Sequence, residues 1–139
     1  MIRNALLMSI RPQYANKIFE GSKTVELRRI KPKLLSDGDL VFVYVSSPIK
    51  SLLGAFVVSS VLEKPLAGLW NVVRNRAGIS KSEFLNYYAG TESGVAIFIK
   101  DVWLLPKPIH LTDLRRQMKD FHPPQSFRYT SINYINNIR

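Results

Sequence analysis

Short runs of alternating apolar and polar residues, rich in Val, Ile and Phe, recur along the chain and constrain its fold more than any other feature. Such runs are typical of β-strands, because successive side chains of a strand point to opposite faces. They predict strands at about Ala5–Ile10, Thr24–Ile30, Leu40–Ser46, Leu52–Leu62, Gly94–Leu105 and Phe127–Ile132.

Helical signals separate several of these strands. Pro12 suits the first position of a helix and Gly21 a helix end, which predicts a short helix after the first strand. Ser80 and Glu83 form a capping box for another helix, which ends near Gly90. An apolar stripe of Leu66, Leu69, Trp70 and Val73 predicts a helical segment that runs until Gly78, and a further short helix is predicted near Asp113–Met118. The segment Asn133–Arg139 is either a frayed helix or a tail.

Runs of strands without a regular alternation with helices indicate an α+β fold rather than a doubly wound parallel sheet. Two halves of a 139-residue chain would each bury little apolar surface, whereas one domain of this size can build a core from the 46% of apolar residues. We therefore predict a single domain over residues 1–139. We expect it to form a compact β-barrel of about five to six mixed strands, with flanking helices and a helical insertion.

The absence of cysteine excludes disulfides, thiolate metal sites and cysteine nucleophiles. The apolar run Ala5–Ile10 is too short for the core of a signal peptide, and no stretch reaches the length of a membrane span. These features predict a cytoplasmic protein that does not enter a membrane. The oligomeric state is left open.

The formal net charge of +10 points to an anionic partner. Nucleic acid fits this charge through neutralisation of its phosphates. An anionic membrane surface would need a basic amphipathic helix, which the sequence lacks. The alternative interpretation is that the charge serves only solubility.

The segment Gly21–Arg29 carries the most chemical information. Within a strand, Val25 and Leu27 would face the core while Glu26 and Arg28 point to the other face. Glu26 is the single acid among the five cations between residues 23 and 33. A carboxylate in this position can orient a neighbouring cation or accept a hydrogen bond from a base, or it can belong to a merely structural network of ion pairs.

Several motifs resemble those of ASCH domains, which have a PUA-like barrel. The opening Leu7–Pro12 is followed by a helix with Tyr14, Lys17 and Ile18, and then by Gly-x-Lys-x-x-Glu-x-Arg at residues 21–28. Asp37-Gly38-Asp39, Ser46-Ser47-Pro48 and Gly54-Ala55-Phe56 extend the similarity, and Pro123–Tyr129 resembles a prokaryotic branch regarded as transcriptional regulators. No helix-turn-helix is visible, so contact with DNA would require a partner.

The resemblance implies a cleft that holds RNA or a nucleotide and is lined by Lys23, Glu26 and Arg28. Some small ASCH proteins instead hydrolyse acylated cytidine with a lysine matching Lys23, a threonine at the position of Glu26 and a separate glutamate. This chain departs from them, since Glu26 replaces the threonine hydroxyl, although Thr24 could substitute if the strand register shifted. The alternative function is therefore an amidohydrolase that uses Lys23 and Glu26 as its catalytic pair.

Other polar residues at strand ends and loops are candidate ligand contacts, because scaffolds present such contacts there. Tyr44 belongs to a strand face that either lines a pocket or packs under a helix. The motifs imply no cofactor or metal: other ASCH proteins resemble nucleases, but a paired-carboxylate signature is absent here and His110 and His122 are far apart. The predicted binding residues are Ser9, Arg11, Lys23, Glu26, Arg28, Arg29, Tyr44, Ser46, Gln125, Ser126 and Arg128.

Overall fold

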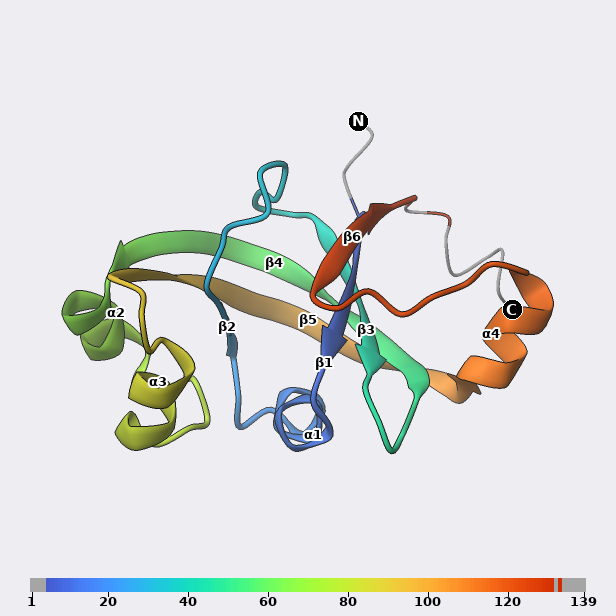
Figure 1. The fold of residues 1–139 in the computed structure, drawn as a ribbon, viewed down its shortest axis with the longest axis horizontal. Coiled ribbons are helices and arrows are strands. Elements are labelled where there is room, and N and C mark those ends of the chain that lie inside the picture. The colour runs from blue at the N-terminus through green and yellow to red at the C-terminus, as the bar shows by residue number, and fades with distance from the viewer. Residues whose placement is uncertain (1–4, 132, 134–139) are drawn as a thin grey trace.

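A computed structural model describes residues 5–131 and Asn133, and within them a single mixed sheet has the strand order β2-β5-β4-β3-β1-β6. Strands β1 and β3 are parallel, and all other neighbouring pairs are antiparallel. The long strands β4 and β5 span the length of the molecule (Figure 1). The strands are β1 (Ala5–Ile10), β2 (Val25–Arg28), β3 (Leu40–Val45), β4 (Ser51–Pro65), β5 (Ser93–His110) and β6 (Phe127–Thr130).

Four helices flank the described part of the sheet, namely α1 (Pro12–Glu20), α2 (Leu66–Val73), α3 (Lys81–Tyr87) and α4 (Leu111–Gln117). Figure 1 shows α2 and α3 at one end of the long strands, α4 at the other end and α1 near the middle. Helix α1 ends at Gly21, whose φ of 94° is readily adopted only by glycine. The capping box of Ser80 and Glu83 is present at the start of α3, as predicted. No helix among the described residues is long and apolar enough to cross a membrane.

The sheet is open, which corrects the prediction of a barrel. Strand β2 pairs with β5 and strand β6 pairs with β1, so that each forms one edge of the sheet. Both edge strands contain only four residues, and side chains rather than backbone hydrogen bonds link them. Arg28 on β2 donates to the carbonyl oxygen of Ser9 on β1 (2.9 Å) and to the hydroxyl of Ser126 just before β6 (3.0 Å). We call the gap that Arg28 bridges the seam.

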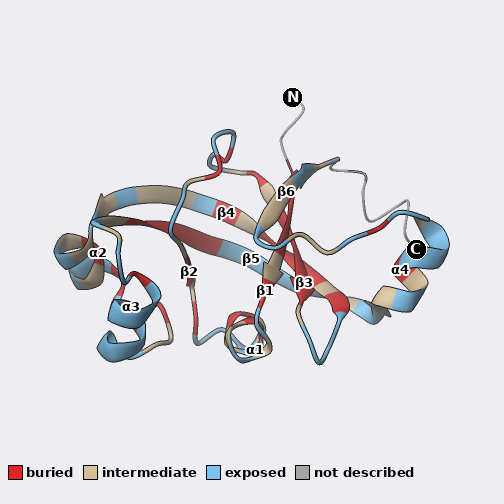
Figure 2. Ribbon diagram, viewed as in Figure 1, coloured by how far each residue is buried: buried red, intermediate tan, exposed pale blue. Residues whose placement is uncertain are grey.

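The core has three parts, one for each group of helices. One face of the sheet packs against Ala15 and Ile18 of α1, and the opposite face packs against Leu114 of α4. Val25 and Leu27 of β2 pack with α2 and α3, as their predicted orientation requires. Figure 2 shows buried residues concentrated in the central strands and exposed residues on the outer sides of the helices.

Two strands are longer than predicted because they pair with each other beyond their apolar segments. Strands β4 and β5 remain paired as far as Pro65 and Ser93 at one end and as far as Ser51 and His110 at the other. Backbone pairing thus extends a strand where side-chain alternation no longer signals it. Ile132 and residues 134–139, which include the predicted end of the last strand and most of the predicted tail, lie outside the described residues.

Candidate functional site

A pocket of about 490 Å³ lies at the seam. Its walls come from the carboxyl end of β1, from α1, β2 and α3, and from the segment that enters β6. Nine of its lining residues were predicted from the sequence, namely Ser9, Arg11, Lys23, Glu26, Arg28, Arg29, Ser46, Gln125 and Ser126. The other five are Ile10, Tyr14, Leu27, Ile79 and Tyr87.

Glu26 and Arg28 form a buried ion pair on the wall of the pocket. Both Nε and a terminal nitrogen of Arg28 contact Oε2 of Glu26, at 3.0 and 2.9 Å. The two residues lie two positions apart on β2, so that the strand places both side chains on one face. Among the described residues none donates a hydrogen bond to Oε1 of Glu26. That oxygen is available to accept a hydrogen bond from a ligand.

Lys23 is almost fully buried beside this pair, with 3% of its surface exposed. Its Nζ donates to the carbonyl oxygen of Ala77 (2.5 Å) and lies 5.4 Å from the ring centroid of Tyr14. Burial lowers the pKa of Lys23 below its ordinary value of 10.5, although the charge of Glu26 opposes this shift. Lys23 therefore releases a proton more readily than a surface lysine does.

Residues 76–78 of the loop between α2 and α3 bind both helix α1 and the segment that precedes β2. Lys17 donates to the carbonyl oxygen of Gly78 (2.6 Å), next to the carbonyl that accepts from Lys23. Thr24 binds Arg76 through its amide (2.8 Å) and through its hydroxyl (3.0 Å). Thr24 does not line the pocket. The arrangement thus directs Lys23 into the site and the hydroxyl of Thr24 away from it.

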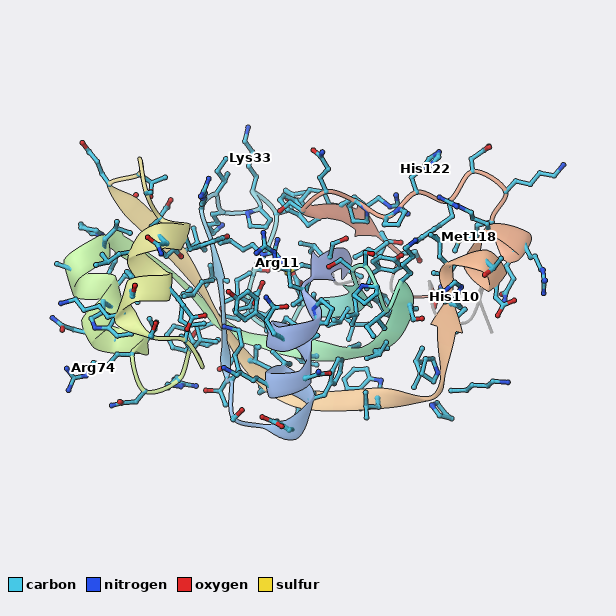
Figure 3. The ribbon with its side chains drawn as sticks, turned by 60° about the horizontal axis from the view of Figure 1, so that its bottom comes forward. Arg11, Lys33, Arg74, His110, Met118 and His122 are labelled. Carbon is cyan, nitrogen blue, oxygen red and sulfur yellow. The ribbon has the colours of Figure 1, made fainter. Side chains whose placement is uncertain are left out.

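Two arginines lie on the exposed rim of the pocket. Arg11 is the single residue between β1 and α1, and Figure 3 shows it near the start of α1. The guanidinium of Arg29 donates two hydrogen bonds to the carbonyl oxygen of Tyr87 and lies 5.2 Å from the ring centroid of that residue. Counting Lys23 and Arg28, four cations line the pocket together with the single carboxylate of Glu26.

Two predicted binding residues lie outside the pocket. Tyr44 is buried under α4, where its ring packs 6.2 Å from that of Phe121, and burial raises the pKa of its hydroxyl. Arg128 donates to the carbonyl oxygen of His122 (2.5 Å) and lies over the ring of Phe121. Both side chains hold the segment after α4 against the sheet, because they lie on the face that packs against α4: Tyr44 belongs to that part of the core, and so does Leu7, the cross-strand partner of Arg128.

The two histidines occupy separate positions near α4 (Figure 3). His110 accepts a hydrogen bond from the amide of Thr112 at the start of α4, while His122 lies in the loop that follows this helix. Within the described residues, no group of three or more His, Cys, Asp or Glu side chains could hold a metal ion.

The sequence analysis did not assign the two tyrosines of the pocket to the binding site. The helical spacing of Trp70, Tyr87 and Tyr88 favours core packing over a base-stacking platform. Tyr14 was part of the motif on the first helix, but the motif did not show which way the ring points. Tyr87 and Tyr88 are neighbours in a helical segment, where one position changes the direction of a side chain by about 100°. Tyr88 is buried and Tyr87 is 37% exposed at the pocket. The sequence spacing could not distinguish the two.

The chain folds as an open mixed sheet that carries helices at both ends and a pocket at the seam. Residues 8–98 match the family model of the ASCH domain. The chain therefore belongs to the ASCH domain family, as its motifs predicted. The wider PUA-like grouping stays a prediction.

Similar proteins agree with this assignment. The chain is 30% identical over 127 residues to an ASCH domain-containing ribonuclease of Zymomonas mobilis, a match that covers 91% of this chain and 84% of the relative. The crystal structure of ASCH from Zymomonas mobilis superimposes with a TM-score of 0.88 at 28% identity, covering 96% and 92% of the two chains. The N-terminal domain of Staphylothermus marinus McrB shares the fold alone, with a TM-score of 0.63 at 11% identity over 99% and 94% of the chains.

None of these three proteins is described as a transcriptional regulator, so that the expected regulatory branch stays a prediction.

Proposed function

We propose that this chain binds RNA and holds a nucleotide in the pocket at the seam. The observation that carries the proposal is the convergence of Lys23, Glu26 and Arg28 in one pocket with Arg11 and Arg29 on its rim. A polyanion with hydrogen-bonding bases suits a site that combines several cations with one carboxylate acceptor. The ribonuclease named among the relatives supports RNA over other anions.

The charged residues divide between positioning and readout. Arg11 and Arg29 are exposed and suit phosphates, which carry no sequence information. Lys23 and Glu26 lie deeper, where an ammonium donor and a free carboxylate oxygen can contact the edge of a base. Substituting Glu26 by glutamine should therefore change the preference among bases, whereas losing Arg29 should weaken the binding of all sequences alike.

The test is a fluorescence anisotropy titration of single-stranded RNA and DNA across a salt series. For single strands, each neutralised phosphate contributes a slope of about −0.7 to log K against log salt. Arg11→Gln should therefore reduce the steepness by about 0.7. Arg74→Gln is the matched control, because Arg74 is an exposed cation that points to solvent at the far end of the molecule (Figure 3). Binding that ignores salt, or equal slopes for the two variants, would contradict the proposal.

Cleavage of the bound RNA is a second candidate, favoured by the buried Lys23 with its lowered pKa. In this reaction the neutral amine of Lys23 removes the proton of a ribose 2′-hydroxyl, and the 2′-oxygen forms a bond to phosphorus. The bond from phosphorus to the 5′-oxygen breaks, and the resulting ammonium returns a proton to that oxygen. A 2′,3′-cyclic phosphate results, and the rim arginines stabilise the charge that develops on the phosphate.

A single 2′-deoxy substitution tests this mechanism, because it removes the nucleophile and leaves the phosphates in place. Cleavage should cease at that position and should be lost throughout with Lys23→Met, while binding persists. Acetylated cytidine is added as a parallel substrate for the amidohydrolase alternative. We expect no deacylation, since Thr24 lies outside the pocket and its hydroxyl binds Arg76. Release of acetate that depends on Lys23 would overturn this expectation.

A further inference from the structure

Tyr87 is an aromatic side chain that is held in place at the pocket and still remains partly exposed. Its hydroxyl donates to the carbonyl oxygen of Leu27 (3.2 Å), and the ring of Tyr88 packs at 4.8 Å with an interplanar angle of 73°. The residue nevertheless has 37% of its surface exposed and lines the pocket. A ring fixed in this way loses little conformational entropy when a ligand packs against it.

Arg29 lies over the same ring and is itself held in a defined orientation. Two of its guanidinium nitrogens, Nε at 2.8 Å and one terminal nitrogen, donate to the carbonyl oxygen of Tyr87. The guanidinium carbon is 5.2 Å from the centroid of the Tyr87 ring. We call this pair the Arg29–Tyr87 stack. Its outer member, Arg29, is exposed at the mouth of the pocket.

We propose that the Arg29–Tyr87 stack is a platform on which one unpaired base of the ligand stacks. A guanidinium plane and an aromatic ring both stack on nucleobases, whatever the base, because every base has a π-face. Bases inside a duplex are already stacked on their neighbours and cannot reach such a platform. The inference rests on the proposed function and narrows its ligand to single-stranded or unpaired RNA.

The other aromatic residues near the pocket are less suited to this role. Tyr14 lines the pocket, but the cation over its ring is the ammonium of Lys23 at 5.4 Å, which, unlike the guanidinium of Arg29, has no plane on which a base can stack. Tyr88 is 1% exposed, and its hydroxyl donates to the carbonyl oxygens of Arg28 (3.0 Å) and Val95 (3.3 Å). Trp70 belongs to the core part formed by α2 and α3 and lies outside the pocket. Tyr87 thus combines an exposed surface with a fixed ring in the pocket.

The experiment uses a ribose-phosphate oligomer without bases and the same oligomer carrying a single 2-aminopurine. Only one base can then stack, so the ratio of the two affinities measures its contribution. With the unmodified protein we expect the base to improve affinity roughly 5- to 150-fold and its fluorescence to be quenched. Arg29→Lys keeps the charge but removes the plane, and Tyr87→Leu keeps an apolar side chain but removes the ring.

Both variants should reduce the advantage of the base, measured within each variant as the ratio of its affinities for the two oligomers, to a few-fold or less. Because the ratio is taken within one variant, it does not depend on how the substitution changes the affinity for the base-free oligomer. Leu85→Ala is the control on α3, because Leu85 is exposed on the same helix but does not line the pocket. If Tyr87→Leu fails to fold, as a melting curve would reveal, Arg29→Lys alone carries the test.

The outcomes separate the two proposals. An advantage of the base that is absent, or that survives in Arg29→Lys, overturns the stacking inference, while salt-dependent binding of the base-free oligomer would still support RNA binding. If the unmodified protein binds neither oligomer and no natural RNA at low salt, the proposed function itself is wrong.

Discussion

Replacing Arg28 by methionine removes the guanidinium that joins the two edges of the sheet. The side chain of Arg28 is 11% exposed and that of its partner Glu26 is 8% exposed. The substitution keeps most of the apolar stem but deletes the contacts to Glu26, to the carbonyl oxygen of Ser9 and to the hydroxyl of Ser126. The expected effect is a loss of folding stability.

The magnitude of the lost folding stability depends on the buried charge of Glu26, which remains when Arg28 is removed. Removing one partner of a buried ion pair costs about 3–5 kcal/mol, because the remaining charge stays buried without compensation. The nearby charge of Lys23 partly compensates Glu26, and water can replace Arg28 at the exposed Ser126. Both effects reduce the expected loss of folding stability to the lower end of this range, about 3 kcal/mol. For a chain of this size such a loss lowers the melting temperature by roughly 10 °C.

Urea unfolding, followed by the fluorescence of Trp70 and Trp103, measures this loss. The double variant Glu26→Gln with Arg28→Met should recover about half of it or more, because no uncompensated carboxylate then remains. A loss below about 1 kcal/mol for Arg28→Met would refute the reasoning. A double variant that is no more stable than Arg28→Met would refute it as well.

Two further predictions concern packing and pH. Gly54→Ala should destabilise the fold by about 3 kcal/mol in urea unfolding, since an added Cβ would lie 2.1 Å from the carbonyl oxygen of Trp103 and 2.9 Å from the ring of Phe19; unchanged stability would contradict this. Because burial lowers the pKa of Lys23 in the folded chain, the folded chain loses this proton at a lower pH than the unfolded chain, in which the lysine keeps its ordinary pKa of 10.5. Between the two pKa values the unfolded chain therefore binds more protons. The stability of the unmodified protein relative to Lys23→Met should therefore rise with pH as this range is crossed, and a flat difference from about pH 7 to 10.5 would exclude a lowered pKa.

Local patterns predicted most of the helices and strands because local physics determines them. Pro12, Gly21 and the capping box at Ser80 each act within one helical turn, and the structure has helix boundaries where they predicted them. The alternation along residues 25–28 likewise predicted which side chains enter the core. Closure of the sheet was predicted wrongly, because it depends on whether two edges distant in sequence meet, and no local pattern reports that.

The sequence predicted nine lining residues of the pocket, from the segment Gly21–Arg29 and from other strand ends and loops. Lys23, Glu26 and Arg28 were chosen from a single segment, and the pocket contains all three. The residue types of Tyr44 and Arg128 suggest ligand contacts, yet the faces of their strands turn both side chains toward α4 and Phe121. The direction of these side chains is fixed by the packing of β3 and β6 against distant segments, which a single sequence does not display.

The position of the pocket at the seam makes binding and stability depend on the same residues. Arg28 links β2 to Ser9 and Ser126, and it also faces any ligand in the pocket. A ligand that adds contacts to this network without displacing Arg28 stabilises the folded chain, by about 2.7 kcal/mol at a ligand concentration of 100 Kd. A phosphate that displaces Arg28 from Ser9 would instead bind more weakly, because the hydrogen bond across the seam is lost. Arg11 on the exposed rim can hold a phosphate without that loss, so a phosphate is expected there, next to the base that packs on the Arg29–Tyr87 stack at the mouth of the pocket.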